Sequence, residues 1–162
     1  MTEALSRRLK QARFINAHQE ALLSLAVAAG ALNDMVDAVC EKHGLTRPQY
    51  NVLRILRGVY PEGHPRCEIA QRMVERAPDV TRLVDRLQTQ GLVRRNRSGH
   101  DHRQAITRIT PKGLKLLETI QPDLDEQTAH LLARLGEKES HELSRLCALI
   151  FDDEARATTA GD

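Results

Sequence analysis

Arginine is concentrated in one part of the chain, where it could bind the phosphates and base edges of nucleic acid. Residues 66–115 carry 12 Lys/Arg against 5 Asp/Glu, a net charge of +7, whereas residues 116–162 carry 4 against 11, a net of −7. The whole chain has a net charge of only +2. Because cations that neutralise phosphates release condensed counterions, so uneven a distribution predicts nucleic acid as the partner.

A helix expected to begin at about Pro78 and stop at Gly91 would carry the first group of these side chains. Its apolar residues recur at helical spacing and predict a buried face: Val80, Leu83, Val84 and Leu87. The opposite face consists of side chains that can read base edges or hold phosphate: Asp79, Thr81, Arg82, Asp85, Arg86 and Thr89.

A hairpin predicted directly after this helix would carry the second group. Leu92–Arg97 and Arg103–Ile109 can pair as antiparallel strands around the polar tip at 98–102. Ile106 and Ile109 are out of phase for a period of two, which suggests a bulge or an early strand end. Arg94, Arg95 and Arg97 are predicted to contact phosphate.

The elements before this helix form a helix-turn-helix. A helix is expected from about Ala21 to Cys40, ended by Gly44, and Thr46-Arg47-Pro48-Gln49 has the form of a capping box for the next. After a Pro- and Gly-rich loop at 59–66, a short helix begins near Cys67 and breaks at Ala77-Pro78. This order is that of a helix-turn-helix: a short helix, a tight break and an arginine-bearing helix. The second helix of such a motif enters the major groove.

Apolar helices at both chain ends predict self-association. Thr110-Pro111 should start a helix that Pro122 kinks or splits. This C-terminal stripe continues through Leu131, Leu135 and Leu143 to Phe151. One small winged lobe offers the end helices too few partners, so we expect a homodimer. The fold class is mainly α with a small β-hairpin wing: a winged helix-turn-helix DNA-binding lobe at 46–113, and dimerisation helices at 1–45 and 114–162.

Composition and the lack of known motifs argue against membrane, secreted and enzymatic functions. At 162 residues the chain is long enough for one domain, and no apolar run of membrane-spanning length or signal peptide stands out. The three cysteines are an odd, widely spaced set. No phosphate-binding loop or nucleophile-elbow motif occurs. We therefore expect a cytoplasmic protein that is not an enzyme, needs no cofactor and does not bind a membrane.

The run EIAQRM…VTRLVDRLQTQGLVRR…DHRQAITRITPKG resembles the MarR (multiple-antibiotic-resistance regulator) family of winged helix-turn-helix transcription factors, most strongly from Thr46 to Leu117. The resemblance implies a two-fold dimer on a pseudo-palindromic double-stranded DNA operator. It places Asp101 and Arg103 on the Asp-x-Arg signature of the wing, where the arginine enters the minor groove. The predicted DNA-binding residues are Pro78, Asp79, Thr81, Arg82, Arg86, Arg94, Arg95, Arg97, His100, Asp101, His102 and Arg103.

The same resemblance implies control by a small molecule. Relatives often hold a small aromatic acid between the dimer helices and the winged lobe, where Arg54 or Arg57 could pair with a carboxylate. The function expected is a repressor that such an effector releases.

Two alternatives stay open, a metal- or redox-responsive regulator on this scaffold and a winged-helix module that binds protein. Cys67, beside Arg66 at a helix start, is the redox candidate. A metal site on His64 with Cys67, or on the wing histidines, is disfavoured because no complete four-ligand spacing exists.

Overall fold

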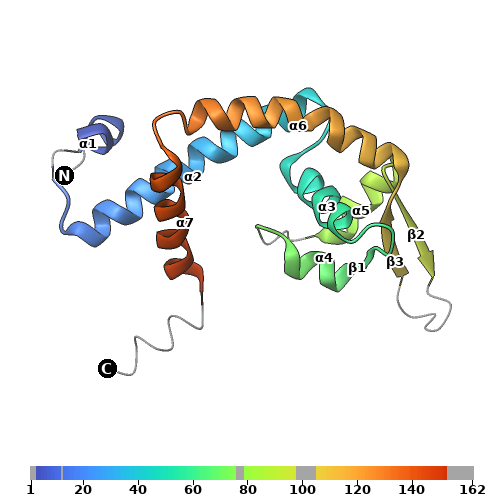
Figure 1. Ribbon diagram of the computed structural model, residues 1–162. Helices are drawn as coiled ribbons and strands as arrows, with labels where there is room; N and C mark the ends of the chain where they lie inside the picture. The colour runs from blue at the N-terminus through green and yellow to red at the C-terminus, as the bar shows by residue number, and fades with distance from the viewer. Residues whose placement is uncertain (1–2, 12, 76–78, 98–104, 153–162) are drawn as a thin grey trace, which may run out of the picture. The chain divides into compact units, whose positions relative to one another are not determined.

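A computed structural model describes residues 3–11, 13–75, 79–97 and 105–152 of the protein. Figure 1 shows the order of its elements. The helices are α1 Glu3–Leu9, α2 Ala17–Lys42, α3 Arg47–Gly58, α4 Arg66–Arg72, α5 Val80–Thr89, α6 Pro111–Leu131 and α7 Glu137–Phe151. The strands are β1 His64–Pro65, β2 Val93–Arg97 and β3 Ala105–Ile109. The chain divides into two compact units, Met1–Asp125 and Glu126–Asp162, and the boundary lies within α6.

Side-chain caps set most of the helix starts. Asn16 accepts a hydrogen bond from the Gln19 amide at 2.9 Å, so α2 begins earlier than the apolar spacing predicts. The capping box predicted for α3 is confirmed, because Thr46 and Gln49 each accept from the other's backbone N–H. The predicted start of α6 is also confirmed, since α6 begins at Pro111 and the Gly113 amide donates to the Thr110 hydroxyl at 3.1 Å.

The helix that follows the break starts later than predicted. Asp79 accepts from the Arg82 amide at 3.0 Å and is the N-cap, so α5 begins at Val80 rather than at Pro78. A carboxylate at the N-cap satisfies a free amide and faces the positive end of the helix dipole, which makes Asp79 the better start. Residues 76–78, the predicted break, lie outside the described residues.

The sheet has three antiparallel strands in the order β1-β3-β2, one more than the hairpin predicted. The third strand lies within the predicted loop, where His64 pairs with Thr107 and Pro65 with Ile106. Gly63 enters it with φ +79, and a side chain there would clash with the Thr107 carbonyl oxygen. A strand of two residues leaves no periodic pattern in the sequence.

The hairpin itself is regular over its described residues. Val93 pairs with Ile109, and the register continues one-to-one to Arg97 with Ala105. The predicted bulge is therefore absent from this part of the chain. Thr107 takes the buried position beside Ile109, whereas Ile106 lies on the other face of the sheet and is half-buried. Ile106 and Ile109 do not fit a period of two because only Ile109 belongs to the core.

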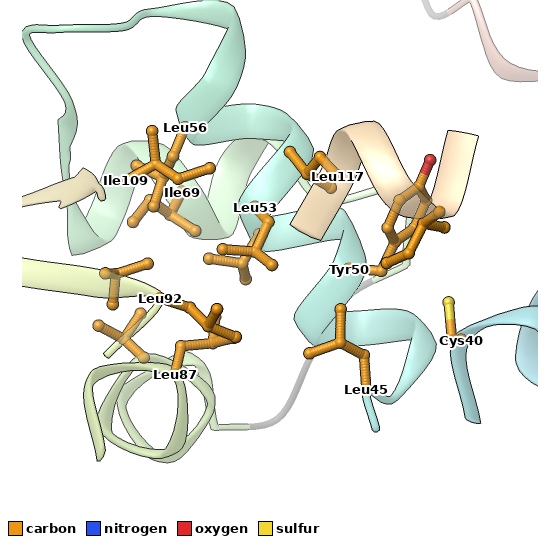
Figure 2. Close-up of a cluster of buried hydrophobic side chains, with 14 of the residues drawn as sticks. Cys40, Leu45, Tyr50, Leu53, Leu56, Ile69, Leu87, Leu92, Ile109 and Leu117 are labelled. Carbon is orange, nitrogen blue, oxygen red and sulfur yellow. The ribbon is translucent and has the colours of Figure 1, made fainter. Parts of the chain in front are cut away.

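One hydrophobic core joins α3, α4, α5, the sheet and α6. Leu53, Leu56, Ile69 and Leu87 are fully buried and belong to a single cluster with Ile109 and Leu117 (Figure 2). The core also includes residues that flank the predicted lobe in the sequence: Val39, Cys40 and Leu45 before it, and Leu117, Ile120 and Leu124 after it. The first half of α6 is thus part of the lobe's core.

The long helices differ from the sequence prediction in two respects. Pro122 does not split α6, which runs unbroken from Pro111 to Leu131. Helix α2, with 26 residues, is long and apolar enough to cross a membrane by length and composition alone. The prediction that the chain has no apolar run of that length is therefore wrong. Only Val39 and Cys40 of α2 are buried in the described structure.

Candidate nucleic-acid interface

Helix α5 presents the predicted arginines on the side opposite its core contacts. Val80, Val84 and Leu87 are buried, while Arg82 and Arg86 are exposed. The Arg82 side chain is 81 % exposed and pairs with Asp79 at 3.0 Å. Asp79 thus caps the helix and holds one of its arginines. Arg86, four residues further along, leaves a second guanidinium in solvent.

Helix α5 and strand β2 are joined through Arg95. Its guanidinium pairs with the Asp85 carboxylate at 2.7 Å and donates to the Thr81 carbonyl oxygen at 3.4 Å. The Arg95 side chain is only 29 % exposed. Two of its donors are bound within the lobe, so Arg95 links the sheet to α5, and its predicted contact with phosphate stays a prediction.

Arg94 differs from Arg95 in its position on the sheet. Arg94 is exposed, and it lies opposite Arg108 in the register, on the face that also carries Ile106. Arg97 is the last residue of β2, opposite Ala105. Alternation along the strand explains the contrast between Arg94 and Arg95, since neighbouring side chains point to opposite faces.

Sequence reasoning missed Arg66, whose side chain contacts helix α5. Its guanidinium donates to the Thr81 hydroxyl at 2.9 Å, so Thr81, predicted to contact DNA, is held from α4. The sequence shows Arg66 only as a neighbour of Cys67, and no local spacing links it to a residue fifteen positions later. Five predicted DNA-binding residues lie outside the described residues: Pro78, His100, Asp101, His102 and Arg103.

The predicted effector-binding arginines lie on α3, next to a buried tyrosine. Arg54 and Arg57 are exposed, and the Arg54 Cζ lies 5.9 Å from the centre of the Tyr50 ring. Burial raises the pKa of the Tyr50 phenol, while the charges of Arg54 and Arg57 act to lower this pKa. Arg54 therefore lies over a buried aromatic ring, and the charge of Arg57 acts on the same phenol.

The cysteines differ in their surroundings. Cys67 is exposed at the second residue of α4, whereas Cys40 is buried. Burial, and then the Asp37 charge, raise the pKa of the Cys40 thiol to about 11, so this thiol stays protonated near neutral pH. Within the described ranges no group of three His, Cys, Asp or Glu side chains is placed to hold a metal ion.

Comparisons with known proteins place this site in a family. A family model described as MarR family matches residues 43–104. The HTH-type transcriptional regulator MhqR of Bacillus subtilis (strain 168) is 31 % identical over 116 residues, which is 71 % of this chain and 78 % of that protein. The crystal structure of a MarR transcription factor from Planctomyces limnophilus is 39 % identical and covers 85 % of this chain and 99 % of its own, with a TM-score of 0.61.

A further solved structure supports the fold. Sco3205, a MarR family transcriptional regulator from Streptomyces coelicolor in complex with DNA, is 22 % identical and has a TM-score of 0.75, covering 89 % of this chain and 94 % of its own. Its likeness confirms the winged-helix architecture of helices α3 to α5 and the sheet. With the identity to MhqR and the matching family model, it follows that this chain belongs to the MarR family and is a DNA-binding transcriptional regulator.

Proposed function

We propose that this regulator is a homodimeric, cytoplasmic repressor with no catalytic role, which binds a pseudo-palindromic operator and is released by a small aromatic acid. The observation that carries the proposal is the position of Arg82 and Arg86, exposed on a helix whose other face is the core. A helix held in this way can enter the major groove, where arginine binds guanine through two parallel hydrogen bonds.

Exposed apolar side chains on helices α2 and α7 support self-association. On α2, Leu22 is 66 % exposed and Leu32 is 46 % exposed. None of the residues of α7 is buried, although Leu146, Ile150 and Phe151 lie along it. We propose that a second copy covers these side chains and that residues 1–45 and 114–162 supply the dimer contacts. Pairing of this kind accounts for the apolar character of α2 without a membrane.

The symmetry of a dimer determines the arrangement of the operator half-sites. A two-fold dimer presents two α5 helices, so the half-sites should be inverted repeats about one helical turn, roughly 10 base pairs, apart. Arg103 of the wing would enter the flanking minor groove, as the family resemblance implies.

Binding to duplex DNA should weaken steeply as salt rises. Each phosphate neutralised contributes about −0.9 to the slope of log K against log salt concentration, and several arginines per protomer predict a slope of about −4 or steeper for the dimer. Titration of a selected duplex at several salt concentrations, followed by fluorescence anisotropy, measures this slope. A protein that binds no duplex at low salt would instead support the protein-interaction module.

Small aromatic acids should raise the melting temperature and weaken operator binding. Salicylate, 4-hydroxybenzoate and 4-coumarate are suitable probes, since each joins a ring to a carboxylate that Arg54 or Arg57 can bind. At a ligand concentration of about 100 Kd the folded state gains about 2.7 kcal/mol. The gain should disappear in Arg54→Met/Arg57→Met and persist in Arg72→Met, a control on α4. If no acid in the panel changes either quantity in the wild-type protein, aromatic acids are not the effectors.

A redox-responsive version of the same regulator rests on one observation, the exposure of Cys67 beside Arg66. Oxidation of this thiol would add charge or bulk at the start of α4, close to the side chain that holds Thr81. The buried Cys40 is unsuited to this role, because its raised pKa keeps the thiol protonated.

A further inference from the structure

A cluster of polar side chains around Arg47 joins three elements of the first unit. Arg47, the first residue of α3, donates through Nε to Asp37 Oδ1 at 3.1 Å and through Nη1 to Asn33 Oδ1 at 2.9 Å. Both acceptors are on α2. The same Nη1 also bonds to Glu75, in the connection between α4 and α5. One guanidinium therefore links α2 to the segment that leads into the recognition helix.

In the connection from α4 to α5, the apolar packing described for the chain stops at Met73. Helix α4 ends at Arg72 and its C-cap Met73 packs against the core, but the next side chain, Val74, is 84 % exposed. Polar contacts replace the missing packing. The Val74 amide donates to Asn51 Oδ1 at 2.9 Å, and Glu75 accepts from Arg47 and, at 3.4 Å, from Asn33. Val74 and Glu75 are thus held by side chains of α2 and α3.

The Arg47 cluster is more than an exposed ion pair. The Arg47 side chain is 24 % exposed and its donors meet acceptors from two directions, so the planar guanidinium fixes both position and angle. Its hydrogen bonds to Glu75 and Asp37 raise the pKa of the guanidinium above its ordinary value. A lysine at this position would keep the charge, but its single ammonium could not hold the same set of acceptors.

We propose that Arg47 and Glu75 form a tether that sets the position of recognition helix α5 relative to α2, so that operator selectivity depends on two residues that do not contact DNA. The proposal rests on the proposed function, because α2 is there assigned to the dimer. In a dimer, a fixed distance from α2 to α5 in each protomer fixes the distance between the two recognition helices, and this distance must match the operator.

The decisive variant is Glu75→Ala, which removes the tether and leaves the contacts of Arg47 with α2 in place. Its matched control is Glu68→Ala on α4, where the carboxylate pairs only with Arg72 of the same helix at 3.3 Å among the contacts described. Both variants remove one negative charge from the winged lobe. Simple electrostatics therefore predicts that both bind DNA equally well or more tightly, whereas loss of the tether predicts that only Glu75→Ala binds its operator less selectively.

The measurement is the ratio of the affinities for two duplexes, one selected from a random library by the wild-type protein and the same duplex with its sequence shuffled. We expect Glu75→Ala to lower this ratio about fivefold, the upper end of what an ion pair of this exposure contributes. Glu68→Ala should leave it unchanged. Arg47→Lys should lower the ratio as Glu75→Ala does. The double variant should lower it no further, because both changes break the same contact between Arg47 and Glu75.

The slope with salt distinguishes a tether from a phosphate contact. If Arg47 acts only in the tether, Arg47→Ala leaves the slope and the affinity for the shuffled duplex as they are in the wild-type protein. If Arg47 meets phosphate, Arg47→Ala weakens the shuffled duplex as well and makes the slope shallower by about one unit. Equal selectivity of Glu75→Ala and Glu68→Ala would overturn the proposal. Failure of the wild-type protein to prefer any duplex would instead refute the proposed function, so the two failures are distinct.

Discussion

Removal of residues 143–162 should lower the affinity for the operator by about a hundredfold or more, because a monomer reaches only one half-site and loses the effective concentration that links the two. The deletion takes away most of the apolar side chains of α7, including Leu146 and Ile150, which are 46 % and 50 % exposed in one chain. Sedimentation at micromolar concentration should show a dimer for the intact protein and a monomer for the shortened one.

Point variants separate the loss of dimerisation from damage to the fold. The test variant, Leu146→Glu/Ile150→Glu, adds two negative charges to the apolar side of α7. Its control, Lys138→Glu, changes the net charge by the same −2 in the first turn of the helix, where an acidic side chain is favourable. The first variant should sediment as a monomer and lose operator selectivity, whereas the second should remain a dimer. A monomeric intact protein that still binds an inverted repeat with full affinity would show that α7 does not form the interface.

Local signals in the sequence predict the helical part of the fold well. Thr46 and Gln49 predict the start of α3, and Thr110-Pro111 predict the start of α6, because both caps are satisfied within a few residues of the chain. The apolar spacing of Val80, Val84 and Leu87 likewise predicts which side of α5 meets the core. Each of these signals acts over one or two helical turns, so no knowledge of the tertiary structure is needed.

The parts that could not be predicted depend on contacts between distant residues. Strand β1 has two residues and exists only because β3 pairs with it. The ion pair of Arg95 is made with Asp85 on the preceding helix, and the hydrogen bond to the Thr81 hydroxyl comes from Arg66 on α4. An arginine in a basic stretch looks the same in the sequence whether it faces a phosphate or a carboxylate. Pro122 is a similar case, since α6 continues past the residue that was expected to split it.

The apolar character of α2 shows why residue type alone can mislead. Its length and composition fit a membrane helix, yet Met35, Val36, Val39 and Cys40 pack on or within the core of the winged lobe. The polar residues Asn33 and Asp37 of the same helix are bonded to Arg47. A helix that carries a bonded polar network on one side and an apolar side chain such as Leu32 on another is suited to a protein partner.

Substitution of both exposed arginines of α5 should have the second large effect. Arg82→Ala and Arg86→Ala should each weaken operator binding by about 1–3 kcal/mol if the guanidinium reads a guanine, and the double variant by about the sum of the two. Among the contacts of the described residues Arg86 has no ion pair and can meet a base at once, whereas Arg82 must first exchange or share its contact with Asp79. The effect of Arg86→Ala should therefore be the larger.

The affinity for a shuffled duplex separates base reading from simple charge. Arg72→Ala is the matched control, because this arginine is 54 % exposed on the neighbouring helix α4 and its removal costs the same charge. An arginine that meets only phosphate should weaken both duplexes alike and make the salt slope shallower by about one unit. Arg86→Ala should instead weaken the operator far more than the shuffled duplex. Equal losses on both duplexes for Arg82→Ala and Arg86→Ala would mean that α5 holds the DNA backbone, and that sequence is read elsewhere in the lobe.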